Sequence, residues 1–266
     1  MGFDSTVWEI LAVNGAVILC YMTAAWIVSL VRRDAGVADI FWGPGFVLTA
    51  WLSFGLTEGY DCRKLIITAL ATLWGLRLGG YIFIRNLGKP EDPRYTAIRR
   101  RHGDSFPLRS LFIIFGLQGV LLFIISLPLQ LAQTAPVPAE LTWFDLAGMA
   151  VWTAGFLFEA VADFQLYRFK ADPANRGRVM DRGLWAWSRH PNYFGETLVW
   201  WGLFIIALST PLGPWTAASP LLITFLLLRV SGVTLLEKNL KKSKPRYDEY
   251  IRKTSAFIPW FPRKGK

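Results

Sequence analysis

Seven apolar runs constrain the fold of this chain more than any other feature, because several of them are long enough to cross a lipid bilayer as helices. Hydrophobic residues make up 53% of the 266 residues and charged residues only 18%, against about 25% charged in soluble domains. A helix needs roughly 20 apolar residues to cross the hydrocarbon core. We therefore expect an all-α, multi-pass transmembrane helical bundle that forms one domain, residues 1–266. The expected spans are Val7–Val31, Ile40–Leu56, Leu65–Ile84, Ser110–Leu131, Trp143–Gln165, Tyr193–Leu208 and Ala217–Leu236.

The positive charges predict how these spans are oriented. With seven spans, 25 basic residues fall on one side of the membrane and two, Arg63 and Lys64, fall on the other, while Arg77 and Arg229 lie within spans. Because short cytoplasmic loops carry the excess of Lys and Arg, the N-terminus is expected outside and the C-terminus in the cytoplasm. The net charge of +10 follows this topology. It indicates contact with anionic membrane lipids and no nucleic-acid binding.

Cysteine and histidine usage gives no sign of a disulfide framework or a metal site. Cys20 and Cys62 fall in or beside different spans and form no CxxC motif. His102 and His190 lie on different loops without the spacing of metal ligands. We therefore expect no bound metal.

The stretch WSRHPNYFGETLVWWG places polar residues at the start of an apolar helix. Pro191 suits the first position of a helix, and a helix N-terminus offers free N–H groups and partial positive charge. Asn192 and Glu196 are four residues apart and share a helix face. Glu196 would lie about one turn inside the bilayer, where an ionised carboxylate is costly. It therefore requires a ligand or, as the alternative, an ion pair with Arg77 or Arg229.

The loop before this stretch is strongly basic. Arginine forks match phosphate oxygens, so the loop and the helix start together predict an anion site, although lipid-facing topology determinants are the alternative. Two further segments approach the same boundary: Glu159 and Asp163 at the end of the preceding span, and the C-terminal tail, whose alternative is an interfacial amphipathic helix. The basic residues of the loop are Arg168, Lys170, Arg176, Arg178, Arg182 and Arg189. The polar residues of the tail are Glu237, Arg246, Tyr247 and Tyr250.

A second polar group lies in the early spans. Asp39 occurs in ADIFWGPGF, and Arg77 and Tyr81 are four residues apart, so they share a face. Ionisable residues inside a membrane indicate a functional site, and a structural Asp39–Arg77 pair is the alternative. The GLRLG pattern, Gly75–Gly79, is typical of helices that approach each other closely.

Five motifs together resemble a known family. They are DxFWGxGF, LWGLRLGxY, EDPRY, RGLWxxSRHPNYFGExxxWWG and a tail with the pattern LE…Y…Y…T..FIPW, and they extend from Asp39 to Pro262. The chain is similar to the 3-oxo-5α-steroid 4-dehydrogenase (steroid 5α-reductase) family, in particular its DUF1295 branch. The shorter motif RHPxYxG also resembles isoprenylcysteine carboxyl methyltransferases, which use S-adenosylmethionine.

The steroid-reductase resemblance implies an NADPH-dependent oxidoreductase that acts on a C=C bond of a hydrophobic α,β-unsaturated carbonyl compound entering from the bilayer. Hydride would go to the β-carbon and a proton to the α-carbon. The chain has no GxGxxG after a strand, so helices and loops, mainly in residues 143–262, would hold the cofactor. The cofactor-binding residues expected from the resemblance and the polar clusters are Asn86, Asp163, Lys170, Arg176, Arg178, Arg182, Ser188, Arg189, His190, Asn192, Tyr193, Glu196, Glu237, Arg246, Tyr247 and Tyr250.

The catalytic candidates are Asp39, Arg77 and Tyr81. Steroid reductases polarise the substrate carbonyl with a Glu in the second span and a Tyr in the third. Asp39 and Tyr81 are the nearest equivalents here, but Tyr81 does not align with the family tyrosine. The alternative function is an isoprenylcysteine-type carboxyl methyltransferase, and a non-enzymatic membrane protein is a third hypothesis. The expected location is a bacterial inner membrane or the endoplasmic reticulum, with the cofactor site facing the cytoplasm.

Overall fold

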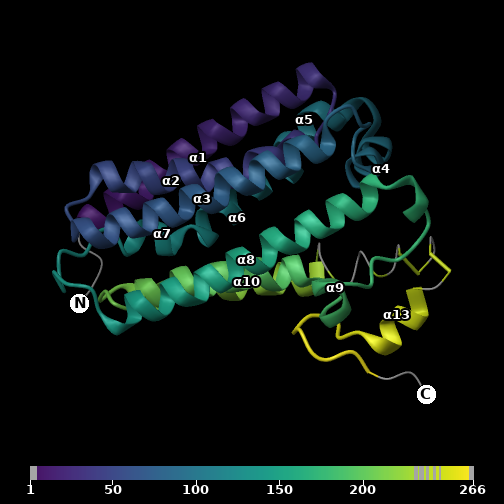
Figure 1. The fold of residues 1–266 in the computed structure, drawn as a ribbon. Helices are drawn as coiled ribbons and strands as arrows, with labels where there is room; N and C mark the ends of the chain where they lie inside the picture. The colour runs from purple at the N-terminus through teal and green to yellow at the C-terminus, as the bar shows by residue number, and fades with distance from the viewer. Residues whose placement is uncertain are drawn as a thin grey trace. The chain divides into compact units, whose positions relative to one another are not determined.

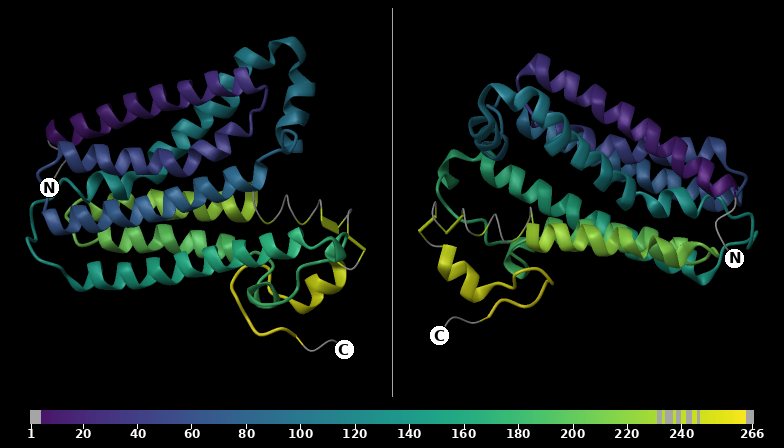
Figure 2. Two further views of the ribbon diagram at one scale, coloured as in Figure 1. Left: turned by 45° about the horizontal axis from the view of Figure 1, so that its top comes forward. Right: turned by 180° about the vertical axis from the view of Figure 1, so that it is seen from behind.

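The computed structural model describes residues 5–230, 233, 237, 240, 241, 244, 245 and 247–263. Within these residues the regular structure is helical, and the only β-type pairing is a single bridge between Ser188 and Ser255. The all-α expectation is therefore confirmed for the described chain. The chain divides into two compact units (Figures 1 and 2): unit 1 comprises Met1–Asp145 and Ile206–Ala218, and unit 2 comprises Leu146–Ile205 and Ser219–Lys266.

Unit 1 is a bundle of long helices joined by short turns. In Figure 1, α2 lies between α1 and α3, which agrees with its extensive contacts to both. Its α-helices are α1 (Ser5–Arg32), α2 (Val37–Leu56), α3 (Asp61–Asn86), α4 (Pro93–His102), α5 (Phe106–Ser110), α6 (Leu117–Ile125) and α7 (Leu127–Leu131). Shorter turns are η1 (Gly103–Ser105), the π-helical turn η2 (Leu111–Gly116) and the 3₁₀ turn η4 (Gly213–Ala217).

Glycines let α2 and α3 pack with their backbones almost in contact. A Cβ atom on Gly43 would lie 2.4 Å from the carbonyl oxygen of Gly75, and one on Gly79 would lie 2.8 Å from Cδ of Pro44. No larger residue fits at such distances, since backbone atoms cannot move aside. The close approach predicted from the small-residue pattern at Gly75 and Gly79 is confirmed.

The expected span Ser110–Leu131 is not one continuous helix. The helix runs through η2 into α6 and ends at Ile125, and a new helix, α7, begins after Ser126. Pro128 lies in the first turn of α7 and has no N–H to continue the preceding helix, so the break has a local cause. The prediction of a single span to Leu131 was wrong at this end.

The two basic residues expected on the less basic side of the membrane are buried. Arg63 pairs with Asp145 at 2.8 Å, and both side chains are at most 1% exposed. Lys64 donates to the carbonyl oxygen of Thr57 at 2.5 Å. Both charges therefore face protein groups, which accounts for their presence in a segment otherwise poor in basic residues.

Unit 2 is built around α8 (Trp143–Ala171) and α10 (Pro191–Ala207), which lie side by side in Figures 1 and 2. A Cβ atom on Gly195 would lie 2.5 Å from the backbone nitrogen of Glu159, so glycine is required at this crossing. The remaining elements are the 3₁₀ turn η3 (Pro173–Asn175), α9 (Leu184–Trp187), α11 (Ala218–Phe225), the π-helical turn η5 (Leu226–Val230) and α13 (Tyr247–Lys253).

Six segments are long and apolar enough to cross a membrane, which supports a multi-pass membrane protein. The expected sixth span corresponds to α10, which has 17 residues, at the short end of the range for a crossing helix. The six segments found among the described residues are Thr6–Arg32, Val37–Leu56, Asp61–Asn86, Pro93–Ile125, Trp143–Ala171 and Gly213–Val230.

Candidate functional site

The start of α10 is the structural centre of the candidate site in unit 2. The helix begins at Pro191, as the sequence predicts. Ser188 precedes it in extended conformation, pairs with Ser255, and donates from its hydroxyl to the carbonyl oxygen of Phe257 at 2.7 Å. The backbone N–H of Arg189 donates to Ser255 at 2.9 Å. These bonds hold the C-terminal segment after α13 against the entrance to α10.

Arg189 fastens the same segment through its side chain. Its Nε atom lies 2.8 Å from Oε1 of Glu237, and its Nη1 atom donates to the carbonyl oxygens of Thr254 at 2.6 Å and Ile251 at 3.2 Å. The side chain is only 9% exposed. Arg189 is one of the residues predicted to contact a cofactor, and the structure shows its guanidinium bonded to Glu237 and to two backbone carbonyls of the C-terminal segment.

Glu237 accepts from two basic side chains. Besides Arg189, Nε2 of His190 lies 3.3 Å from the same carboxylate oxygen, and the ring of Tyr193 stacks on His190 at 5.6 Å. Burial by itself would raise the pKa of Glu237, but the hydrogen bonds from His190 and Arg189 outweigh it and lower the pKa to about 2. Glu237 is therefore a carboxylate at neutral pH, and it brings three predicted residues together.

Two tyrosines of α13 lie beside this cluster and differ in their hydrogen bonding. The hydroxyl of Tyr250 donates to the carbonyl oxygen of Trp185 at 2.5 Å. The hydroxyl of Tyr247 is buried and has no hydrogen-bond partner among the described residues, although the two rings are 5.8 Å apart. Burial raises the pKa of Tyr247, so its hydroxyl stays protonated. An unpaired buried donor of this kind suits a ligand or an ordered water.

Asp163 of α8 and Asn192 of α10 meet across the two helices. The side-chain amide of Asn192 donates to Oδ1 of Asp163 at 3.2 Å, and Asp163 is buried. Glu159 lies one turn earlier on α8, and Glu196 lies, half-buried, one turn further along α10. The structure therefore brings two of the predicted residues, Asp163 and Asn192, into direct contact.

Two polar pockets of about 480 Å³ each adjoin the end of α8. The first is lined by Lys170, Arg176 and Lys244, with Asp172 as its acidic member. The side chain of Lys244 donates to the carbonyl oxygen of Arg178, and burial lowers the pKa of Lys244. Three basic side chains around one cavity form a setting in which an anion is favoured.

The second pocket contains Arg168 and Arg182 and shares Asp172 with the first. The guanidinium of Arg182 lies over the ring of Phe169, 5.7 Å from its centre. The side chain of Arg178 is exposed. The basic loop therefore surrounds two cavities instead of one continuous surface, and Arg246 lies outside the described residues.

The polar group of unit 1 has a partner that the sequence reasoning missed. Asp39, in the first turn of α2, accepts from the hydroxyl of Tyr95 at 2.7 Å and from Nη2 of Arg94 at 2.8 Å. Arg77 and Tyr81 lie one turn apart on α3. The motif EDPRY contains both missed residues, so the signal was present, but nothing in the sequence showed that the first turn of α4 lies beside the start of α2.

Glu91, the first residue of that motif, holds the turn before α2 through a hydrogen bond. Glu91 accepts from the backbone N–H of Ala35 at 2.8 Å and pairs with Arg99 at 2.7 Å. Burial opposes its ionisation, but the bonds from Arg99 and Ala35 hold the pKa of Glu91 below its usual value. Asn86, expected at the cofactor, is the last residue of α3 and accepts from Arg85 at 3.3 Å. It belongs to unit 1, unlike the other predicted cofactor residues.

Comparisons with known proteins place the chain beside uncharacterized relatives. Residues 25–254 match the model of a family described as protein of unknown function, DUF1295. An uncharacterized protein of Schizosaccharomyces pombe is 28% identical over 270 aligned positions, which cover 88% of this chain and 75% of the relative. No solved structure matches the chain.

Proposed function

The chain belongs to the DUF1295 family, and we propose that it is a membrane-embedded, NADPH-dependent reductase of a C=C bond in a hydrophobic α,β-unsaturated carbonyl compound. The observation that carries this proposal is the arrangement along α8. Asp163, paired with Asn192, and Lys170, at the first basic pocket, are seven residues apart on this helix, which corresponds to about 10 Å. A carboxylate–amide pair and a basic cavity at this separation suit the two ends of one elongated, phosphate-bearing molecule.

The residues of unit 2 fit such a cofactor chemically. Lys170, Arg176 and Lys244 would hold its phosphates, since their cavity combines three cations with one carboxylate. Asn192 and Asp163 offer amide and carboxylate groups for a carboxamide, and the unpaired hydroxyl of Tyr247 is a further donor. When bound, NADPH supplies the hydride that the β-carbon of an enone accepts. The methyltransferase alternative needs fewer cations, because S-adenosylmethionine carries no phosphate.

We assign the polarisation of the substrate carbonyl to the polar group of unit 1. Tyr95 and Arg94 donate an O–H and an N–H to the carboxylate of Asp39, which orients both side chains. On substrate binding the Tyr95 O–H would turn from Asp39 to the developing enolate oxygen, where a donor contributes a few kcal/mol to catalysis. This assignment makes Tyr95 the phenol that polarises the substrate carbonyl. Tyr81 and Arg77 of α3, which the sequence predicts as catalytic residues, are the alternatives. Activity of Tyr95→Phe and Tyr81→Phe, compared on one substrate, separates the two phenols.

The proposed topology has seven spans, with α10 as the sixth, the N-terminus outside and the C-terminus in the cytoplasm. The distribution of Lys and Arg between the loops supports it, because short cytoplasmic loops carry the excess of positive charge. A reporter fused to the C-terminus should be active only in the cytoplasm, whether the host membrane is a bacterial inner membrane or the endoplasmic reticulum. Activity of that reporter outside would overturn the topology and with it the cytoplasmic location of the cofactor site.

The first experiment is a titration of the detergent-purified protein with NADPH and, separately, with S-adenosylmethionine, followed by thermal unfolding. A ligand of the native state present at 100 times its Kd stabilises the protein by about 2.7 kcal/mol. We expect stabilisation by NADPH alone. Stabilisation by S-adenosylmethionine alone would replace the proposal with the methyltransferase, and stabilisation by neither would reject both.

Two variants test the assignment of cofactor residues. Arg178→Ala should weaken NADPH more than NADH if the exposed guanidinium meets the 2′-phosphate. Arg252→Ala is the control, because Arg252 is exposed on α13 and lines neither basic pocket. Glu196→Gln should weaken cofactor binding while leaving the protein folded. Equal losses for NADPH and NADH would remove Arg178 from the 2′-phosphate, and unchanged affinity would remove Glu196 from the site.

A further inference from the structure

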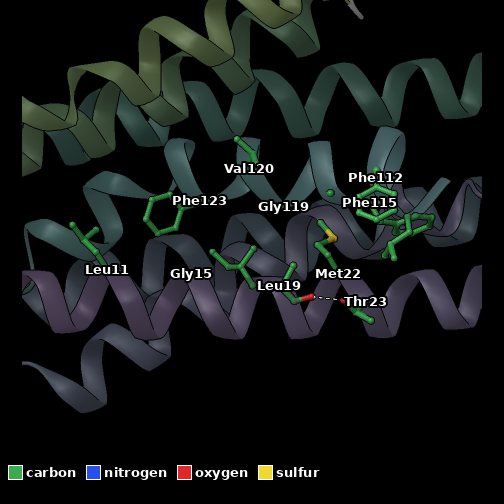
Figure 3. Close-up of a pocket in the computed structure, with 13 residues that line it drawn as sticks. Leu11, Gly15, Leu19, Met22, Thr23, Phe112, Phe115, Gly119, Val120 and Phe123 are labelled. Atoms are coloured by element: carbon green, nitrogen blue, oxygen red, sulfur yellow. Dashed lines mark hydrogen bonds between the residues drawn. The ribbon is translucent and has the colours of Figure 1, made fainter. Parts of the chain in front are cut away.

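An apolar groove lies between α1 and the segment formed by η2 and α6, entirely within unit 1. Its volume is about 510 Å³. Figure 3 shows Leu11 and Phe123 at one end and Thr23 and Phe112 at the other, with Gly15 and Gly119 between them. Leu11 and Thr23 are twelve positions apart on α1, or about 18 Å, which is somewhat more than half of a hydrocarbon core of about 30 Å.

The lining of the groove excludes polar ligands. Its one hydroxyl, that of Thr23, already donates to the carbonyl oxygen of Leu19 at 2.8 Å. Buried Ile18, Met22 and Phe115 form the floor. Gly119 lines the groove beside Met22, and a Cβ atom there would lie 3.6 Å from Met22, in ordinary contact, so only a side chain longer than alanine would fill the space. A narrow, dry, apolar channel of this length fits one extended hydrocarbon chain.

The rim of the groove opens outward from the bundle. Leu19 is 65% exposed, Phe112 is 66% exposed, and Val120 on α6 also reaches outward. Both walls belong to segments apolar enough to cross a membrane. The medium around this rim is therefore the acyl region of the bilayer, and the occupant can enter sideways.

The two ends of the groove differ in charge. At the end of Thr23, the indole of Trp26 donates to the carbonyl oxygen of Pro107 at 2.9 Å and ties α1 to α5. Arg109, two residues before the groove residue Leu111, is exposed and makes no ion pair within the described part of the chain. At the other end, the nearest charge along α1 is exposed Glu9, two residues before Leu11. An anionic headgroup is therefore attracted to the first end and repelled from the second.

The wider surroundings of Arg109 strengthen this asymmetry. Arg32, the last residue of α1, and Arg100 and Arg101 of α4 are also exposed, whereas Asp104 is the one exposed carboxylate between Arg101 and Arg109. Each Lys or Arg near an anionic membrane surface contributes about 1 kcal/mol of attraction. The groove therefore combines a hydrocarbon slot with a cationic rim at one end only.

From this geometry we propose that the groove is a binding site for an anionic glycerophospholipid, with one acyl chain between α1 and α6 and the headgroup at Arg109. The proposal is independent of the reductase function. Unit 1 would then bind a lipid from the basic side of the membrane. The apolar groove would contact its acyl chain, and the basic residues would attract its headgroup.

The wild-type protein provides the first test. Purified in a neutral maltoside detergent, it is mixed with phosphatidylglycerol that carries a diazirine on one acyl chain, irradiated, and mapped by peptide mass spectrometry. We expect cross-links on Leu11–Thr23 and Leu111–Phe123. Cross-links distributed over the other spans, or confined to them, overturn the proposal, and this readout needs no variant to fold.

Two matched pairs of variants separate the contribution of the apolar groove from that of the basic residues at its rim. Bound lipid is counted by native mass spectrometry. Gly119→Leu fills the slot and should lower phosphatidylglycerol binding roughly tenfold, equivalent to the loss of about two buried CH₂ groups. Gly80→Leu is its control, because a Cβ there meets nothing within 4 Å. Arg109→Gln should lower the preference for phosphatidylglycerol over phosphatidylcholine about fivefold, and Arg252→Gln should not.

Equal binding of phosphatidylglycerol and phosphatidylcholine by the wild type overturns the headgroup assignment and therefore the proposal. Unchanged lipid binding by a folded Gly119→Leu variant overturns the slot. Because NADPH stabilisation is measured separately, a failed lipid test leaves the reductase hypothesis standing, and loss of NADPH binding does not affect the lipid result.

Discussion

Two arginine–carboxylate pairs, Arg63–Asp145 in unit 1 and Arg189–Glu237 in unit 2, have the same Nε–oxygen distance of 2.8 Å but different surroundings. Arg63 also donates to the carbonyl oxygens of Pro138 and Glu140, and both side chains of its pair are sealed from solvent. The side chain of Glu237 is 17% exposed. The first pair is closed, whereas the second is accessible.

The difference teaches how to distinguish a structural pair from one at a functional site. Asp145 accepts from the N–H and the hydroxyl of Thr142 as well as from Arg63, so its hydrogen-bonding capacity is filled by protein. The second pair lies beside the hydroxyl of Tyr247, which has no partner among the described residues. Distance alone does not separate the two pairs, but saturation of the neighbouring polar atoms does.

Breaking the closed pair should have the largest effect. Asp145→Asn leaves Arg63 buried beside a neutral side chain and should cost about 3–5 kcal/mol of folding stability. Asp61→Asn is the matched control, because Asp61 is 94% exposed and lies 3.9 Å from Lys64, where a pair contributes about 0–1 kcal/mol. The thermal midpoint and the yield of monodisperse protein in detergent measure both effects.

The double variant Arg63→Met with Asp145→Leu sharpens this result. Replacement of a buried ion pair by apolar side chains of similar volume is often neutral, so the double variant should recover much of the stability that Asp145→Asn loses. Similar destabilisation by Asp61→Asn and Asp145→Asn would show that burial does not distinguish the pairs, and the structural assignment would fail.

The helix crossing that supports the open pair should show the next largest effect. Gly195→Ala places a methyl group 2.5 Å from the backbone nitrogen of Glu159, and overpacking of this kind typically costs about 1–3 kcal/mol. Gly80→Ala is the control, since its methyl group meets nothing and alanine favours a helix by about 1 kcal/mol. Opposite shifts of the thermal midpoint are expected, and a neutral Gly195→Ala would refute the close contact of α8 with α10.

Local chemistry made much of this architecture predictable. The apolar runs located α1, α2, α3 and α8 to within several residues of their ends, Pro191 marked the start of α10, and small residues indicated the crossing at Gly75. The end of α6 at Ile125 was not predicted although Pro128 signals it, because the residues on both sides of the break are apolar and hydropathy alone does not mark it. Residue type and spacing along one element carry such information directly.

Contacts between residues that are far apart in the sequence were not predictable in the same way. Tyr95 reaches Asp39 from the first turn of α4, 56 positions away, and Arg189 is bound by the backbone carbonyl of Thr254. Any residue type can supply a backbone carbonyl, so the sequence does not show which one accepts a hydrogen bond. The bonds of Arg189 to the protein could therefore not be predicted from its position in a basic loop. The sequence identified polar residues of the site but not which of them organise it.

Acidification should affect the open pair specifically. The pKa of Glu237 is lowered from its ordinary value of 4.5 to about 2, so the pair contributes stability above about pH 4.5 and loses it as the pH falls towards 2. Glu237→Gln removes this contribution, expected at about 1 kcal/mol after allowance for solvent exposure. The difference in thermal midpoint between wild type and Glu237→Gln should therefore shrink between pH 5 and pH 2.5.

A matched measurement on an exposed carboxylate of unit 1 tests whether that response is specific. Over the same pH range, the difference between Asp61→Asn and wild type serves as the baseline for an exposed carboxylate. If the Glu237→Gln difference does not change with pH, the carboxylate of Glu237 is not held by Arg189 and His190 in solution.

The smallest effect on stability is expected for Tyr247→Phe, and it is the one that most sharply separates an open site from a closed one. Loss of an unpaired buried hydroxyl should leave stability unchanged or raise it by up to about 1 kcal/mol, whereas Tyr250→Phe, which loses a bond to Trp185, should cost about 1 kcal/mol. If the Tyr247 hydroxyl instead serves the cofactor, NADPH affinity should fall roughly fivefold in Tyr247→Phe. Destabilisation equal to that of Tyr250→Phe, with unchanged NADPH affinity, would mean that the Tyr247 hydroxyl has a structural partner. The surroundings of the Arg189–Glu237 pair would then be saturated like those of the Arg63–Asp145 pair.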